Sequence, residues 1–225
     1  MQRDLTKGSV LHNLLLFSVP YLLSCFLQSF YGLADLFITG QFNGAAAISA
    51  VSIGSQVTHM LTVVVVGLTM GTTVMIGRAV GSGDKSLAAR AIGGTVVLFA
   101  AVAAISTAVL LFAADGIITV LSTPAEAVDQ TRSYLMICFL GCPFIVAYNV
   151  ISSIFRGMGD SKSPMYFIAV AGVVNIALDF LFIGPFGMGA AGAALGTVLS
   201  QAVSVVISLI MLRKKGLGIP LSRAD

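Results

Sequence analysis

Two aspartates, Asp35 and Asp179, are the acidic residues that lie well inside long apolar stretches of this 225-residue sequence. A charged side chain in hydrocarbon costs from about 2.5 to more than 10 kcal/mol, so such residues usually face a cavity, pair with another group or take up a proton. No lysine or arginine lies at the depth of either aspartate. We therefore expect a proton or a metal cation, with Na⁺ as the candidate metal, to neutralise the pair, and an exchangeable ion of this kind is what a transporter uses for coupling.

Polar residues accompany both aspartates. Tyr31 precedes Asp35 by four residues and Asn175 precedes Asp179 by four, which puts each pair on one helix face. Thr197 lies in the next apolar stretch. One interpretation is that these groups only bond to one another and stiffen a helix bundle. Because two carboxylates without a basic partner cannot neutralise each other, the sequence instead predicts that the acids share a proton or hold one cation, helped by the three polar neighbours.

The two aspartates also begin similar segments, DLFITGQFNGAA at 35–46 and DFLFIGPFGMGAA at 179–191. In each copy the aspartate stands five residues before a glycine, a phenylalanine follows two residues later, and Gly-Ala-Ala opens the next apolar stretch. An internal repeat would place both acids at the same depth, about 7 Å from the turn on a helix rising 1.5 Å per residue. Shared membrane composition is the alternative explanation of the match.

The composition excludes a water-soluble protein. Hydrophobic residues make up 57% of the sequence and charged residues 9%, against about 25% charged in soluble domains, and the mean hydropathy is +1.01. A soluble enzyme, a disordered regulator and a secreted disulfide scaffold are therefore excluded. The three cysteines lie inside apolar stretches, which predicts buried thiols and neither a disulfide framework nor a zinc site.

The elements that must position these residues are six apolar stretches, each long enough to cross a bilayer as a helix of about 20 residues. They do not alternate as the strands of a membrane barrel would. The predicted fold is an all-α membrane bundle of six transmembrane helices over 13–212, between an N-terminal segment 1–12 and a basic tail or linker 213–225. The six stretches are 13–39, 46–76, 91–114, 134–155, 165–184 and 190–212.

The distribution of basic residues predicts the orientation. Eleven of the twelve Lys and Arg residues lie in the two termini and in alternate connections, and Arg132 is the one exception. Basic residues favour the cytoplasmic side, so we expect a multi-pass protein of the cell membrane, in a bacterium the inner membrane, with both termini cytoplasmic and lipid around it. The basic residues form no stripe, which predicts no nucleic-acid partner.

Prolines mark candidate hinges and helix starts. Pro20 and Pro143 lie inside the first and fourth stretches, where each removes a backbone donor and should kink its helix. Either kink is a candidate hinge, with an ordinary packing kink as the alternative. The residues TPAE at 123–126 predict a capping box, and SP at 163–164 predicts a second cap followed by proline.

Other polar residues in the stretches are predicted to be structural. His59, alone in the second stretch, is interpreted as a buried core histidine and not as a proton relay. Four amides are interpreted as hydrogen-bond partners between helices; these are Gln28, Gln56, Asn149 and Gln201.

Five segments together resemble the multidrug and toxic-compound extrusion (MATE) family of secondary transporters, in its N-terminal six-helix lobe. The resemblance covers almost the whole chain. It implies an antiporter that expels organic, often cationic or amphipathic, compounds using inward flow of Na⁺ or H⁺, without a cofactor. The segments are YGLADLFITG (31–40), GRAVGSGD (77–84), FRGMGDSKSPM (155–165), NIALDFLFIG (175–184) and GAALGTVLSQ (192–201).

The resemblance also implies a site and a partner. Carried over by position, the family's cation site falls on Tyr31, Asp35, Asn175, Asp179 and Thr197. Family members have about twelve helices in two lobes, and this chain spans one. The resemblance therefore implies a second six-helix lobe or a homodimer partner, because alternating access needs two moving halves.

Three other functions remain as alternatives. A flippase-like exporter of lipid-linked oligosaccharides would favour a basic cavity, yet the middle of each stretch lacks Lys and Arg. A non-transporting assembly subunit would leave the paired acids without a purpose. A membrane enzyme is the least favoured, because the sequence has no HExxH or GxSxG motif.

Overall fold

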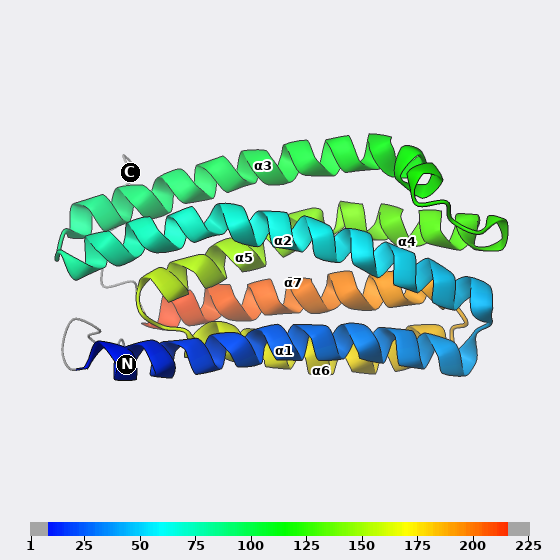
Figure 1. The fold of residues 1–225 in the computed structure, drawn as a ribbon, viewed down its shortest axis with the longest axis horizontal. Helices are drawn as coiled ribbons and strands as arrows, with labels where there is room; N and C mark the ends of the chain where they lie inside the picture. Colours follow the sequence, from blue (N-terminus) through cyan, green and yellow to red (C-terminus); the bar gives the residue numbers. More distant parts are fainter. Residues whose placement is uncertain (1–8, 216–225) are drawn as a thin grey trace.

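The computed structural model describes residues 9–215, and all their regular elements are helical. The helices lie side by side in an elongated bundle (Figure 1). Five of them are long and apolar enough to cross a membrane, and α4 with α5 forms a sixth span with a 47° bend. This arrangement confirms the predicted six-helix membrane bundle. The elements are α1 (Val10–Phe42), α2 (Ala45–Gly81), α3 (Lys85–Val120), η1 (Ala125–Ala127), α4 (Val128–Leu140), α5 (Cys142–Gly157), α6 (Lys162–Ile183) and α7 (Gly189–Lys215).

The connections alternate between the two ends of the bundle. We call the end with residues 9 and 215 and the turns at 82–84 and 158–161 the terminal end, on the left in Figure 1. The opposite end carries the α1–α2 turn, the segment around η1 and the α6–α7 turn. The helices extend a few residues beyond most of the predicted stretches, because polar residues at their ends continue the helical turn.

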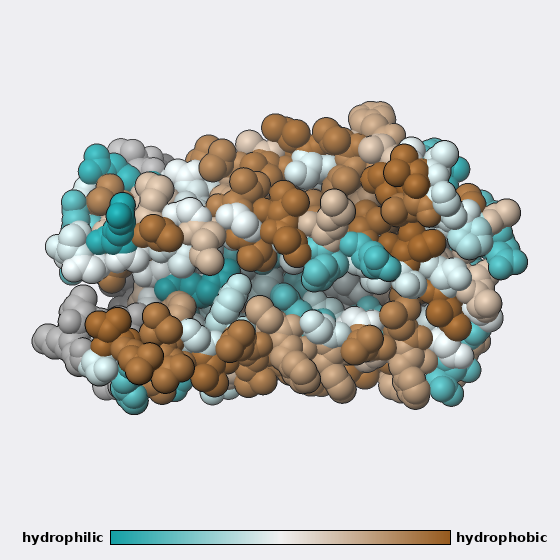
Figure 2. Space-filling view, in the orientation of Figure 1, coloured by the Kyte–Doolittle hydropathy of each residue, from teal (hydrophilic) through white to brown (hydrophobic). Residues whose placement is uncertain are grey.

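Large apolar side chains remain exposed around the outside of the bundle, as in Phe112 of α3, which is 91% exposed. Brown apolar surface covers much of the face in Figure 2. Exposure on this scale is the mark of a surface that meets lipid. Cys138 and Cys142 are buried as predicted, but Cys25 is exposed; that prediction was wrong because α1 has few buried residues.

The centre of the bundle is α5, in which twelve of sixteen residues are buried. Phe155 packs edge to face against Phe167 of α6, with ring centroids 5.5 Å apart. Gly157 lets α5 approach α2 closely, since a Cβ there would lie 2.8 Å from Cβ of Ile76. Small residues at helix crossings are how membrane bundles gain van der Waals contact.

The two prolines behave differently. α1 continues without a break through Pro20, whose carbonyl accepts a hydrogen bond of 2.8 Å from Ser24 Oγ. The kink predicted in span four is present, but the break falls at Gly141 and Pro143 lies in the first turn of α5, where a missing N–H costs nothing. A side chain at Gly141 would collide with Val198 of α7. Hinge motion at either proline stays a prediction.

Both predicted helix starts were wrong. Residues 125–127 form a short 3₁₀ turn, α4 begins at Val128, and Thr123 Oγ1 donates back to the Ile118 carbonyl at 3.1 Å instead of capping. The N-cap of α6 is Ser161, whose side chain makes no capping hydrogen bond, and the Ser163 N–H is instead accepted by Asp160 Oδ1 at 3.0 Å. The helix therefore begins at Lys162, before the Ser-Pro pair.

Candidate functional site

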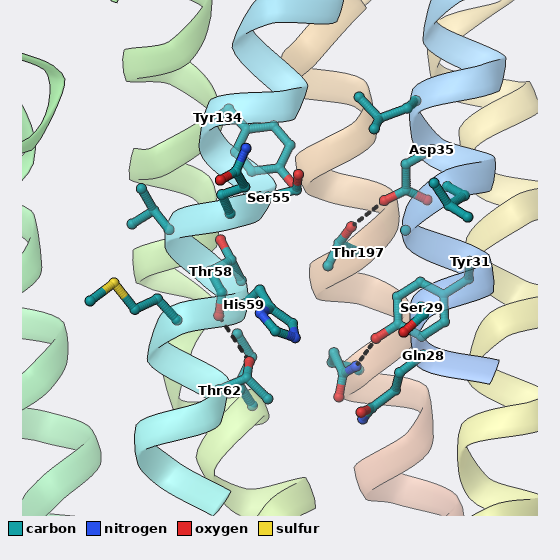
Figure 3. A pocket seen from close by; sticks show the side chains of 18 of the residues that line it. Gln28, Ser29, Tyr31, Asp35, Ser55, Thr58, His59, Thr62, Tyr134 and Thr197 are labelled. Carbon is teal, nitrogen blue, oxygen red and sulfur yellow. Dashed lines mark hydrogen bonds between the residues drawn. The ribbon is translucent and has the colours of Figure 1, made fainter. Parts of the chain in front are cut away.

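The two aspartates predicted to act together are both buried near the opposite end of the bundle. Asp35 on α1 is 2% exposed, and Asp179 on α6 is fully buried beside Asn175, one turn earlier on the same helix. Thr197 of α7 donates a hydrogen bond of 3.2 Å from Oγ1 to Asp35 Oδ2 (Figure 3). Asp179 and Asn175 lie close enough to the Asp35 carboxyl to interact with it. Three helices therefore bring four of the five predicted residues together.

Most polar atoms of this cluster have no protein partner. Within residues 9–215, no hydrogen bond reaches Asp35 Oδ1, either carboxyl oxygen of Asp179 or either amide atom of Asn175. Buried polar atoms are normally bonded, and each exception calls for an explanation. The two carboxylates also form no ion pair with a described basic side chain, so their charge is uncompensated by the protein.

Gly196 is a part of this cluster that the sequence reasoning missed. It precedes Thr197 on α7, and a Cβ built there would collide with Asp179 Oδ1 and lie 3.6 Å from Asn175 Nδ2. Only glycine lets the α7 backbone come this close to the α6 carboxyl group. The available signal was its place beside Thr197 in GAALGTVLSQ, but a helical glycine in a membrane protein is too common to single out.

Tyr31, the fifth predicted residue, lies one turn from Asp35 toward the terminal end. Its hydroxyl accepts a hydrogen bond of 3.4 Å from Gln201 Nε2 of α7, and Figure 3 shows this bond below Asp35 and separate from the Thr197 bond. Tyr31 therefore lines the approach to the acids. The prediction that Gln201 bonds between helices is confirmed.

A groove of about 740 Å³ opens beside the acids. It lies between α1 and α2, with α4, α5 and α7 contributing its other walls. In Figure 2 polar side chains gather along a hollow between the two apolar halves of the visible face. Asp35 and Thr197 reach this groove, and its lining contains no Lys or Arg. The polar lining residues include Gln28, Ser29, Tyr31, Ser55, Gln56, Thr58, His59, Thr62, Tyr134, Asn149 and Gln201.

The groove corrects several structural predictions. His59 is exposed and lines the groove, so its interpretation as a core histidine was wrong. Gln28 and Gln56 line the groove as well, and Asn149 bonds the Ile145 carbonyl of its own helix at 2.8 Å. The sequence held a signal for this face, because Ser55, Gln56, His59 and Thr62 recur at helical spacing on one side of α2 and all line the groove.

The donor set of the acid cluster fits a hard cation or a proton. Carboxylate, amide and hydroxyl oxygens come from Asp35, Asp179, Asn175 and Thr197, and oxygen ligands are what hard cations prefer. Among the described residues, no three His, Cys, Asp or Glu side chains cluster as a metal site. Two carboxylates and two neutral oxygen donors are the groups that this cluster offers to such an ion.

Comparisons with known proteins agree with the fold and the segments. The chain is 35% identical over 211 residues to the probable multidrug resistance protein YpnP of Bacillus subtilis, which covers 94% of this chain and 47% of the relative. It is 29% identical to a FAD transporter of Shewanella oneidensis, covering 89% of this chain and 44% of the relative. The chain thus spans about half the length of these relatives.

A solved structure agrees as well. A MATE crystal structure in the bent conformation superposes with a TM-score of 0.90 at 27% identity, covering 97% of this chain and 49% of the other. The model of the MatE family matches residues 20–181. These residues include both aspartates and five of the six spans. The chain is therefore a multi-pass membrane protein that belongs to the MatE family.

Proposed function

We propose that this chain forms one lobe of an ion-coupled exporter of organic compounds. The observation that carries the proposal is a pair of buried carboxylates, Asp35 and Asp179, of whose four oxygens only Asp35 Oδ2 has a protein partner, beside a groove lined by polar and apolar side chains. Its relatives include a probable multidrug resistance protein and a multidrug export protein, which supports efflux as the activity.

The coupling ion, Na⁺ or H⁺, binds between α1 and α6. Two neighbouring carboxylates in a site of low dielectric repel each other strongly, so an ion between them draws the helices together and its release drives them apart. Asp35 lines the groove and bonds Thr197 of α7. A change at the acids therefore moves a wall of the cargo site, which links ion binding to cargo binding.

Alternation requires a second half. A single bundle has no opposing surface across which the path could open and close, so the working transporter contains a second six-helix lobe or a second copy. Following the basic residues, the terminal end faces the cytoplasm and the acids lie nearer the outside. The ion then enters from outside and runs inward while cargo moves outward.

The groove favours cationic or amphipathic cargo. It offers aromatic rings, amides and hydroxyls together with the Asp35 carboxyl, and it lacks Lys and Arg. This lining disfavours the flippase alternative, since an anionic pyrophosphate-linked cargo needs basic partners. Cargo of this kind would bind by apolar contact with few fixed polar bonds.

The proposal is tested by dye efflux from proteoliposomes that contain the assembled transporter. A sodium gradient and a proton gradient are applied in turn to the wild type, Asp35→Asn, Asp179→Asn and the control Asp115→Asn. The control removes an aspartate that is 67% exposed and pairs with Arg132, so its efflux should equal that of the wild type. Each site variant should lose gradient-driven efflux while keeping its thermal unfolding transition. Normal efflux and ion dependence in both site variants would show that the carboxylates are structural.

A further inference from the structure

We propose that His59 sets the charge preference of the groove: the neutral imidazole admits a cationic cargo and the protonated imidazolium rejects it. The proposal rests on the proposed function in one respect, that the groove holds cargo. It assigns a role to a side chain that the ion site does not use.

The position of His59 makes it a cargo-facing group. It stands fourteen residues into α2, whereas Asp35 stands seven residues before the end of α1, so the two differ by about 10 Å in depth along the bundle. Figure 3 shows its ring pointing from α2 across the groove toward α1, near Gln28 and Tyr31. The side chain is exposed and has no hydrogen-bond partner within residues 9–215.

Few other groups around the groove can change charge. α1 contributes Asp35 and Tyr31, α4 contributes Tyr134, α5 contributes Tyr148, and α7 contributes only neutral side chains. Tyrosine hydroxyls stay neutral between pH 5.5 and 8. No residue of α3 or η1 lines the groove. The ionisable residues of these two elements are Lys85, Arg90, Asp115 and Glu126. The thiols of α4 and α5, Cys138 and Cys142, do not line it either.

Apart from the tyrosines, Asp35 and His59 are thus the two lining residues whose side chains can carry a charge. Asp35 is 2% exposed and bonded to Thr197, so it belongs to the ion site. His59 is exposed and lines the groove. Its role therefore concerns which cargo binds, and the acid pair remains responsible for coupling.

The charge of His59 has a large effect in this setting. Histidine is the side chain whose charge ordinarily changes near neutral pH, and the groove has low-dielectric walls that weaken screening. An imidazolium a few ångströms from a bound cation should weaken its binding by about tenfold or more. A neutral cargo of the same shape feels no such repulsion, and the neutral ring offers it an aromatic face.

The test measures equilibrium binding of two dyes of similar size, one permanently cationic and one neutral, to the purified protein in nanodiscs at pH 8 and pH 5.5. In the wild type, the cationic dye should bind about tenfold more weakly at pH 5.5, and the neutral dye should bind equally at both. His59→Gln should remove most of this decline. His59→Lys should bind the cationic dye weakly at both pH values. His12→Gln, which changes an exposed histidine near the start of α1 outside the groove lining, should behave as the wild type.

The outcomes separate this proposal from the function on which it rests. If His59→Gln keeps the full decline, the acid pair causes it and the proposal is wrong. A wild type without a decline, or without dye binding, also overturns the proposal. Binding is measured without a gradient, so dye binding with the expected pH profile but without gradient-driven efflux would contradict the exporter and leave the role of His59 intact.

Discussion

Replacing Gly196 with alanine aims a single methyl group at the proposed ion site. The new Cβ would collide with Asp179 Oδ1 and crowd Asn175, so α6 and α7 must separate or the carboxyl group must rotate away. Overpacking of this kind typically costs about 1–3 kcal/mol. Alanine in a helix gains about 1 kcal/mol over glycine. The stability of the fold should therefore fall by at most about 2 kcal/mol.

Ion binding should suffer more than stability. If the Asp179 carboxyl group has to move, the overpacking cost of about 1–3 kcal/mol destabilises the ion-bound state. This cost corresponds to about five- to 150-fold weaker binding of the coupling ion. The assay is the ion concentration that gives half-maximal efflux, with thermal unfolding in detergent measured in parallel. The matched control is Gly94→Ala on α3, where a Cβ meets no atom within 4 Å.

The control should keep its ion dependence and gain up to about 1 kcal/mol of stability. Gly196→Ala with wild-type ion dependence would refute the reasoning, because the close approach of α7 to Asp179 would then be irrelevant to the site. An equal loss of ion affinity in Gly196→Ala and Gly94→Ala would point to a general effect of alanine on the helices.

Two further predictions concern the opposite end of the bundle and the orientation. Arg132→Gln should lower stability by less than about 1 kcal/mol, since its ion pair with Asp115 joins side chains that are 57% and 67% exposed; a larger shift in the unfolding transition would reveal a structural role for the pair. The orientation is tested in a Cys25→Ser background, which removes the exposed native thiol. An impermeant maleimide applied outside intact cells should label Glu126→Cys but not Lys85→Cys. The reverse labelling pattern would invert the proposed topology.

Hydropathy and charge were enough to predict the six spans and the acid cluster, because an unpaired carboxylate in hydrocarbon is costly wherever the chain folds. The position of His59 in the groove was not predicted in this way. His59 shares one face of α2 with Ser55 and Gln56, but only the packing of α2 against α1 and α7 shows that this face meets a cavity and not the core. Gly196 was missed for a related reason: its importance lies in the distance between two backbones, which no residue type records.

The burial of α5 has a consequence for the biogenesis of this protein. α4 and α5 qualify as a membrane span only when taken together, and α5 carries Asn149, Ser152 and Ser153 on buried surfaces that contact other helices instead of lipid. Polar side chains near the middle of a segment oppose its release from the translocon into the bilayer. The fourth span should therefore enter the membrane with the help of α2 and α3, its predecessors in synthesis and its neighbours in the bundle. Retention of α2 and α3 beside the translocon until the fourth span emerges would make the order of insertion part of how this lobe folds.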